Sequence, residues 1–177
     1  RYDVYIYGLC SDSDTSLGSF VTTFVTDCDV ISTLPFTENF TGYATGTSAT
    51  YHYPICWGGG SNYSTSYPYF NTVDNDVAEY LYCYASSAAN SGNMYTYIAM
   101  PAIDSTQYQI TDMMVSFRAK AGTISTYYDQ RLYVGVSTDP NDPSTFVAVD
   151  TLDLNASTNW VSFDELDFSS YTGSGKY

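Results

Sequence analysis

The segments Leu34-Pro-Phe-Thr-Glu-Asn-Phe40 and Pro54-Ile-Cys-Trp57 enclose a stretch of the chain that is rich in Gly, Ser, Thr and Tyr. The proline of the first segment restricts the residue before it to an extended backbone, and aromatic residues and threonine favour pleated strands. Cys28 stands shortly before this stretch, and Cys56 stands near its end. Together these features predict the entrance of a secreted β-sandwich.

The composition also favours strands. Of the 177 residues, 20 are tyrosine and 18% are aromatic, whereas only 5 are Lys or Arg. Such a chain favours half-buried strands over helices, and it is long enough for one medium domain and part of another. Apolar and polar residues alternate in several segments, as they do in β-strands, and no segment shows a convincing 3.6-residue helical repeat. The expected strands lie at residues 2–9, 19–26, 78–85, 94–100, the second half of 108–119, 130–137, 146–152 and 160–168.

Strands at this spacing predict an all-β fold, an antiparallel β-sandwich of the jelly-roll type. Residues 2–26 are expected to form a separate hairpin, which is marginal in water without further partners. Residues 41–69 show weak periodicity and are expected to be ordered loops. Residues 173–177 resemble the start of one more strand, so a jelly roll ending there would have an open edge. Because the chain begins within a strand pattern, we expect it to be a piece of a larger protein.

The charge argues against two classes of partner. With 19 acidic residues against 5 basic ones, the formal net charge is −14. A surface this negative repels a phosphate backbone and an anionic membrane, so neither nucleic-acid binding nor direct membrane insertion is expected. Scattered carboxylates suit an extracellular setting in which Ca²⁺ occupies sites made of oxygen ligands, although simple solubility explains them as well.

The cysteines predict an oxidising compartment. Cys10, Cys28, Cys56 and Cys83 include no Cys-x-x-Cys pair, and the chain has one histidine, which argues against a zinc or redox site. An even number of cysteines in an acidic chain rich in Tyr, Ser and Thr fits a setting in which disulfides constrain long loops. Four cysteines allow three pairings, and the sequence alone leaves all three open.

An ordered series of short motifs carries a resemblance to two families. Residues 1–26 resemble the C-terminal hairpin of a fibronectin type III domain. Residues 34–177 resemble the cleaved-adhesin or choice-of-anchor jelly roll, which is MAM-like, and residues 27–33 would be a linker. The two families occur together in secreted surface proteins of Bacteroidota. The motifs lie at residues 34–40, 54–57, 80–84, 97–101, 115–117, 132–137 and 160–163.

The resemblance implies three structural features. It pairs Cys28 with Cys56, which leaves Cys10 for Cys83, a bridge that would join the hairpin to the jelly roll. It makes residues 34–40 the first strand, in which Glu38 matches an acidic residue that helps to hold a cation. It also implies that the jelly roll lacks its final strands, which invites completion by an added strand.

Calcium is the most specific local prediction. Asp74-Asn75-Asp76 brings oxygen ligands together on a turn, as Ca²⁺ requires, so Glu38, Asp74 and Asp76 are the predicted ligands. The alternative is a hydrated turn in which the Asp and Asn side chains bond to their own backbone. Both readings stay open on the sequence alone.

Aromatic loop residues predict a second kind of site. Tyr63, Tyr67 and Trp57 could stack on sugar faces, whereas Trp57 could instead pack as a core anchor beside Cys56. Catalysis is not expected, because His52 is the single histidine and the chain has no Gly-x-Ser-x-Gly elbow and no phosphate-binding glycine loop.

These observations predict a non-catalytic adhesion or recognition module of a secreted or cell-surface protein, with calcium as the one implied cofactor. Its partner would be a host or cell-surface protein or a glycan, contacted through loops on a rigid sandwich. One alternative is a carbohydrate-binding module accessory to a secreted glycosidase. Another is a structural subunit that self-associates by strand addition at an open sheet edge.

Overall fold

The computed structural model describes residues 2–6, 9–11, 14–15, 19–24, 28–41, 43, 54, 56–62, 67–71, 80–84, 95–122, 130–154 and 158–177. Regular structure in these residues consists of β-strands and two single-turn 3-10 helices, and every pair of strands is antiparallel. The predicted all-β, antiparallel class is therefore confirmed.

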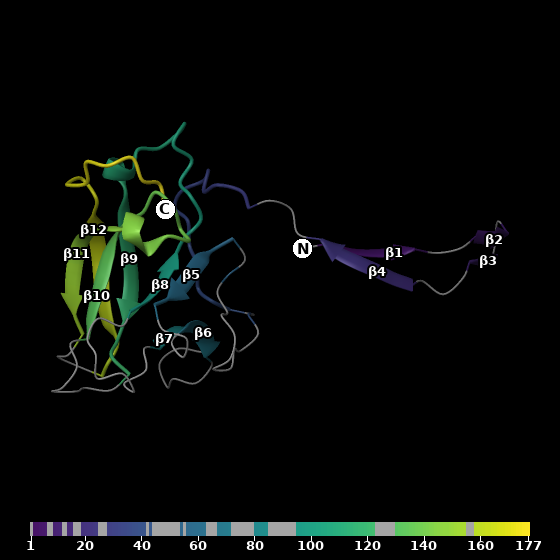
Figure 1. Ribbon diagram of the computed structural model, residues 1–177, viewed down its shortest axis with the longest axis horizontal. Coiled ribbons are helices and arrows are strands. Elements are labelled where there is room, and N and C mark those ends of the chain that lie inside the picture. Colours follow the sequence, from purple (N-terminus) through teal and green to yellow (C-terminus); the bar gives the residue numbers. More distant parts are fainter. Residues whose placement is uncertain are drawn as a thin grey trace.

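The N-terminal residues form a hairpin. β1 (Tyr2–Ile6) pairs with β4 (Ser19–Phe24), and the shorter β2 (Leu9–Ser11) pairs with β3 (Asp14–Thr15). In Figure 1 this hairpin extends away from the other strands, with β2 and β3 at its outer end. The expected hairpin within residues 2–26 is present, whereas its origin in a fibronectin type III domain stays a prediction.

Two further pairs lie in the middle of the chain. β5 (Gly58–Ser61) pairs with β8 (Thr96–Ala99), and β6 (Tyr67–Asn71) pairs with β7 (Tyr80–Tyr84). The sequence predicted β7 and β8 but placed β5 and β6 in ordered loops. That part of the prediction was wrong because β5 opens with three glycines and β6 contains a proline, and both residue types are rare in strands.

The remaining strands form two pairs in the C-terminal half. β9 (Met114–Ala119) pairs with β12 (Val161–Asp167), and β10 (Arg131–Val136) pairs with β11 (Val147–Asp153). The sequence predicted all four strands. Exposed and half-buried residues alternate along β9 and the first half of β10, so each strand turns one face to the interior.

A small hydrophobic cluster fills the interior between these pairs. Its buried members are Val136, Phe168 and Tyr171. Partly buried side chains from β9, β10, β11 and the segment around the 3-10 helix η1 (Ile110–Asp112) pack against them, namely Ile110, Met113, Val115, Val134 and Val149. Because the cluster draws on both pairs, the β9–β12 and β10–β11 pairs pack against each other. Its partly buried members show that the interior is incompletely covered.

A β-bulge interrupts the β10–β11 pair. The register shifts between Val134 and Gly135, so Val149 is the extra residue on β11. A side chain at Gly135 would collide with the partner strand, because its Cβ would lie 2.8 Å from the Cα atom of Ala148. Only glycine permits this close approach of the two backbones.

Residues 34–40 do not form a strand, which corrects the expectation that the jelly roll begins there. The strand-like contact falls earlier, at Ile31, which forms an isolated parallel bridge with Ile103. Pro35 has no N–H to donate to a ladder, and Phe40 has a φ angle of 60°, in the left-handed region. The aromatic residues that suggested a strand therefore lie in a turning loop.

Candidate binding surface

Cys28 and Cys56 form a disulfide, with their Cα atoms 5.1 Å apart, which is the pairing that the resemblance implied. Trp57 directly follows the bridge and packs edge-to-face on Phe40, with ring centroids 5.9 Å apart. Both residues are half-buried. Aromatic pairs of this geometry stabilise a fold beyond the area that they bury. The contact favours the interpretation of Trp57 as an anchor of the loop over its use as a sugar platform.

The second expected bridge, between Cys10 and Cys83, is absent. Cys83 lies on β7 and forms no disulfide, and burial raises the pKa of its thiol to about 11. β2, which carries Cys10, lies at the outer end of the hairpin, away from β7 (Figure 1). The expectation was wrong because it followed from elimination alone, and the fold does not bring these two strands together.

The Glu38 carboxylate makes two hydrogen bonds to residues that follow it closely in the chain. Its Oε1 atom accepts the backbone N–H of Phe40 at 2.6 Å, and its Oε2 atom accepts the Tyr43 hydroxyl at 3.0 Å. Partial burial, this hydrogen bond and the negative charge of Glu38 raise the pKa of Tyr43 above its ordinary value. Since both oxygens have protein partners, Glu38 would have to share them in order to hold a metal ion.

The other residues predicted for calcium or sugar binding cannot be placed beside Glu38. Asp74, Asp76, Tyr63 and His52 lie outside the described residues, and Tyr67 is described only as part of the β6 backbone. Among the described residues, no three His, Cys, Asp or Glu side chains lie close enough together to hold a metal ion. The calcium site and the sugar-stacking tyrosines therefore stay predictions.

The acidic turn between β10 and β11 is held by its own side chains. Oδ1 of Asp142 accepts the backbone N–H of Ser144 at 2.9 Å and its hydroxyl at 2.7 Å, at the start of the 3-10 helix η2 (Pro143–Thr145). These hydrogen bonds, led by the hydroxyl, lower the pKa of Asp142. At the base of the turn, the hydroxyls of the buried Ser137 and of Thr145 lie 2.6 Å apart. The end of β10 is thus firmly positioned.

Two cations flank the ring of Trp160. The guanidinium of Arg118 lies 5.6 Å from the ring centroid and the Lys120 ammonium lies 5.3 Å from it. Tyr80 packs edge-to-face on the same ring at 5.8 Å, and the indole Nε1–H is buried without a hydrogen-bond partner. Sequence reasoning missed this cluster. Its signal was the spacing of Arg118 and Lys120, because residues two apart on an extended chain share a face.

The last residues of the chain lie between two other segments. On one side, the N–H of Ile103 donates to the Lys176 carbonyl at 2.8 Å. On the other side, the N–H of Ser137 donates to the Tyr177 carbonyl at 2.9 Å, and the Ser137 carbonyl accepts the N–H of Tyr177 at 3.1 Å. Residues that exchange both backbone bonds form an antiparallel hydrogen-bonded pair. Ser137 and Tyr177 therefore begin a ladder at the end of β10, where the sequence had suggested the start of a strand.

A buried hydrogen bond and a close approach at Gly175 hold this C-terminal segment in place. The N–H of Gly175 donates to the Tyr171 hydroxyl at 2.8 Å in the interior, and Tyr171 belongs to the hydrophobic cluster. A Cβ atom at Gly175 would lie 2.7 Å from both the Ser137 carbonyl oxygen and the Val136 side chain. Glycine at this position lets the segment approach the end of β10.

One edge of β10 faces no described strand. Successive residues of a strand direct their backbone groups to opposite edges. Ser137 faces the C-terminal segment, so Gly135 and Tyr133 face the same way. The backbone groups of Val134 and Val136 face β11 instead. The Gln130 carbonyl lies on that same edge, where it accepts the Leu154 N–H at 2.9 Å. Within the described residues β10 pairs only with β11. We call the backbone row of Tyr133, Gly135 and Ser137 the β10 edge.

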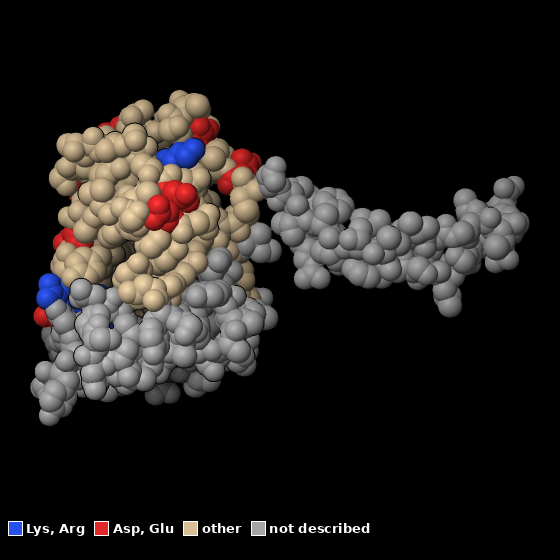
Figure 2. Space-filling model, viewed as in Figure 1, with Lys and Arg blue, Asp and Glu red and all other residues tan. Residues whose placement is uncertain are grey.

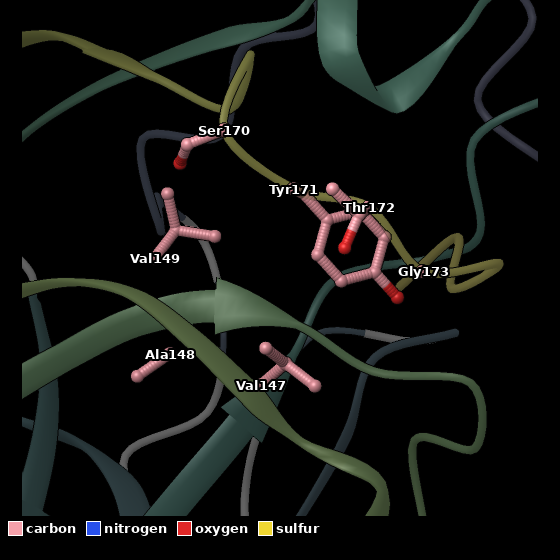
Figure 3. A pocket seen from close by; sticks show the side chains of 7 residues that line it. All are labelled: Val147, Ala148, Val149, Ser170, Tyr171, Thr172 and Gly173. Atoms are coloured by element: carbon pink, nitrogen blue, oxygen red, sulfur yellow. The ribbon is translucent and has the colours of Figure 1, made fainter.

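A groove of about 240 Å³ lies beside β11. Val147, Ala148 and Val149 line one side, and residues 170–173, which follow β12, line the other (Figure 3). Its lining consists of small apolar residues, hydroxyl side chains and the ring of Tyr171, whose hydroxyl already binds Gly175. The groove offers apolar contact and no charged group, so it gives weaker grounds for a ligand than the β10 edge does.

The described surface carries little positive charge. Figure 2 shows acidic side chains scattered over the visible face, with few basic ones between them. This distribution agrees with the formal net charge of −14. Among the described residues, no helix has the length and apolar character needed to cross a membrane.

Comparison with known proteins identifies no relative, since no family model, curated protein or solved structure matches the chain.

Proposed function

We propose that this chain is a non-catalytic adhesion or recognition module of a secreted or cell-surface protein, built on a jelly-roll sandwich. The observation that carries the proposal is the β10 edge, which begins at the Ser137–Tyr177 pair and faces no described strand. An exposed strand edge is a ready template for another chain, and many recognition domains bind peptides in this way.

The architecture supports this proposal. The β9–β12 and β10–β11 pairs pack face to face through one hydrophobic cluster, as the two layers of a sandwich do. In this proposal the N-terminal hairpin is the end of a preceding fibronectin-type domain.

The disulfide supports the proposed location. The Cys28–Cys56 bridge indicates an oxidising environment, since such bridges are rare in reducing compartments. Secretion or display at the cell surface is the simplest way for this acidic chain to meet such an environment. Calcium at Glu38, Asp74 and Asp76 remains part of the proposal as an accessory ion that would stabilise the loops.

The experiment that tests the function is a binding measurement on the immobilised chain. The analytes are an unfolded polypeptide such as a reduced and alkylated protein, the same protein in its folded state, a neutral polysaccharide and an acidic polysaccharide. We expect saturable binding of the unfolded polypeptide and no chemical change in any analyte. Absence of binding to both forms of the protein, or release of a reaction product, would overturn the proposal.

The carbohydrate-binding alternative has its own outcome in this experiment. It predicts saturable binding of a polysaccharide that is lost in Tyr63→Ala or Tyr67→Ala. The packing of Trp57 on Phe40 counts against it, because a ring used as a sugar platform must present a free face. We therefore rank it below the adhesion module.

A further inference from the structure

We infer that Arg118 and Lys120, beside the ring of Trp160, form a binding site for a single carboxylate of a partner polypeptide. The site lies on the β9–β12 pair, and its carboxylate chemistry does not depend on the β10 edge. That the carboxylate belongs to a polypeptide rests on the proposed function. We call Trp160, its two cations and Tyr80 the Trp160 cluster.

The strand register brings the two cations to one side of the sheet. Val161 of β12 pairs with Ala119 of β9. One further step along this antiparallel ladder sets Trp160 opposite Lys120. Arg118 lies two residues before Lys120, so its side chain leaves the strand on the same face. Both cations therefore project beside the indole, in agreement with their distances of 5.6 and 5.3 Å from the ring centroid.

This face of β9 points away from the hydrophobic interior. Val115, on the opposite face, packs against the hydrophobic cluster, and Phe117 contacts Phe163 with ring centroids 5.4 Å apart. Arg118 is exposed and Lys120 is half-buried. A ligand can therefore reach the guanidinium from solvent without disturbing the interior.

The polar groups of Trp160 and its two cations are all hydrogen-bond donors. A guanidinium and an ammonium have no acceptor atom, and neither has an indole. The Nε1–H of Trp160 is buried without a hydrogen-bond partner, although buried donors are normally paired. The group that complements such a cluster is an acceptor with a negative charge.

Arg118 forms no ion pair with a carboxylate of its own chain. Acidic residues are plentiful, and Asp164 and Glu165 follow shortly after Ser162, which pairs with Arg118. Among the described residues, however, none of these carboxylates bonds to the guanidinium, whose contact is the Trp160 ring. A guanidinium can bind a carboxylate through two parallel hydrogen bonds. That capacity of Arg118 is therefore left for a ligand.

The charge of the whole chain selects an isolated carboxylate. A formal net charge of −14 repels a polyanion or a doubly charged phosphate more strongly than it repels a single negative charge. The attraction of the two cations acts over a short range, since salt screens exposed charges beyond about 8 Å at physiological ionic strength. One carboxylate on an otherwise neutral segment meets the attraction and little of the repulsion.

The ring favours a polypeptide over an acidic sugar as the carrier of this carboxylate. Trp160 is already contacted by two cations and, edge-to-face at 5.8 Å, by Tyr80. Little of the ring is left for stacking on a sugar, whereas an aspartate or glutamate side chain needs no such platform. The inference commits to the polypeptide and makes the acidic sugar an outcome of the test.

The test uses two capped peptides that differ in one group. Acetyl-Gly-Ser-Glu-Ser-Gly-amide carries one carboxylate, and acetyl-Gly-Ser-Gln-Ser-Gly-amide carries a neutral amide of similar shape. NMR titration of the isotope-labelled chain follows the Nε–H signal of Arg118, with that of Arg131 as the reference. We expect saturable movement of the Arg118 signal with the glutamate peptide and at least about tenfold weaker binding of the glutamine peptide, because charge-assisted hydrogen bonds are lost. Equal affinities, or an Arg118 signal that does not move, would overturn the inference.

Three variants locate the site. Arg118→Gln and Lys120→Gln each remove one cation of the cluster, and Lys176→Gln removes the same charge near the end of the chain as the matched control. With the backbone amide of Ala119 as the probe, we expect each of the first two to weaken binding of the glutamate peptide at least about fivefold, with the control close to the unmodified chain. Unchanged binding by Arg118→Gln would contradict the assignment. An equal loss in Lys176→Gln would show that overall charge governs binding, which would also overturn the site.

A measurement without mutations covers the case in which these variants do not fold. Sodium chloride at about 0.5 M should weaken binding of the glutamate peptide to the unmodified chain and leave that of the glutamine peptide unchanged, because salt screens exposed charges. Binding of the glutamate peptide that is insensitive to salt would refute an ionic contact.

A second matched pair, glucuronate and glucose, identifies the carrier. Tighter binding of glucuronate than of the glutamate peptide would replace the polypeptide by an acidic sugar and overturn that part of the inference. Failure of the inference is also distinguishable from failure of the proposed function. If unfolded polypeptide binds the immobilised chain and the glutamate peptide leaves the Arg118 signal unmoved, only the carboxylate site fails. If the glutamate peptide binds at Arg118 and the immobilised chain binds neither form of the protein, the proposed function fails while the carboxylate site stands.

Discussion

The hydroxyl of Tyr171 accepts a hydrogen bond from the backbone N–H of Gly175, 2.8 Å away, within the hydrophobic interior. This bond joins the core cluster to the segment that ends in the Ser137–Tyr177 pair. The buried Tyr171 phenol therefore helps to hold the C-terminal residues, together with their backbone bonds to Ile103 and Ser137.

Tyr171→Phe should lower the free energy of unfolding by about 1–3 kcal/mol, because the buried N–H of Gly175 loses its acceptor. Urea denaturation gives the difference. Tyr133→Phe is the matched control and should be neutral, since Tyr133 is 51% exposed. A Tyr171→Phe variant as stable as the unmodified chain would show that water replaces the phenol.

The Cys28–Cys56 disulfide should contribute on the order of 3–4 kcal/mol, because the two cysteines are 28 residues apart and closing a loop of that length restricts the unfolded chain. A Cys28→Ala/Cys56→Ala variant, or the reduced chain, should melt at a lower temperature. Cys83→Ser is the control, and it should respond to a reducing agent as the unmodified chain does, because that thiol forms no disulfide. Insensitivity of the melting temperature to a reducing agent would count against the bridge.

Gly135→Ala should destabilise the chain by on the order of 3 kcal/mol or prevent folding, because the new Cβ would collide with the β11 backbone. Gly122→Ala is the matched control. Its Cβ would meet only the Tyr82 ring, at 3.6–3.7 Å, an ordinary contact. Denaturation midpoints of the two variants compare the sites directly, and similar values would mean that the bulge relaxes easily.

Asp142 should titrate below 3.8, its ordinary pKa, because Ser144 donates its hydroxyl and its N–H to the ionised carboxylate. A lowered folded-state pKa means that this contribution to stability is present above the unfolded-state pKa and is lost as the pH falls through the folded-state pKa. Carbon NMR of the carboxyl group measures the value. Ser144→Ala should raise it toward 3.8, whereas Thr138→Ala should leave it unchanged.

The calcium prediction has a thermal test. If Glu38, Asp74 and Asp76 hold Ca²⁺, adding the ion should raise the melting temperature and EDTA should reverse the effect, because a ligand of the folded state stabilises it. Asp74→Asn should abolish the response, and Asp104→Asn, at another carboxylate, should retain it. A melting temperature that neither Ca²⁺ nor EDTA changes would remove the metal from the proposal.

The strands whose side chains alternate are the easiest to predict from the sequence. β9 and β10 carry apolar residues at every second position, so local pattern and tertiary burial agree. In β11 and β12 the half-buried residues are three positions apart, and the register of each pair shifts. β5 and β6 were not predicted, because pairing with β8 and β7 overrides the poor strand propensity of Gly58 and Pro68. For residues 34–40 the error was the opposite one, since a strand was predicted where none forms. The Glu38 carboxylate accepts the backbone N–H of Phe40 within the same segment, and the segment turns.

The candidate site was predictable only in part. The suspicion that residues 173–177 begin a strand came from the sequence, but the partner, Ser137, lies far away along the chain. No local pattern encodes such a pairing, because backbone hydrogen bonds are the same for every residue except proline. The Cys10–Cys83 pairing failed for a related reason, since elimination among cysteines ignores where the fold places them.

The chain has two tryptophans, and they occupy unlike environments: Trp57 packs on Phe40 beside the disulfide, and Trp160 lies beneath two cations at the start of β12. Each indole is therefore a native optical label for a different region of the molecule. Replacing one ring at a time by phenylalanine would separate the emission of the disulfide loop from that of the β9–β12 pair. Unfolding of the two regions could then be followed independently, without any added dye.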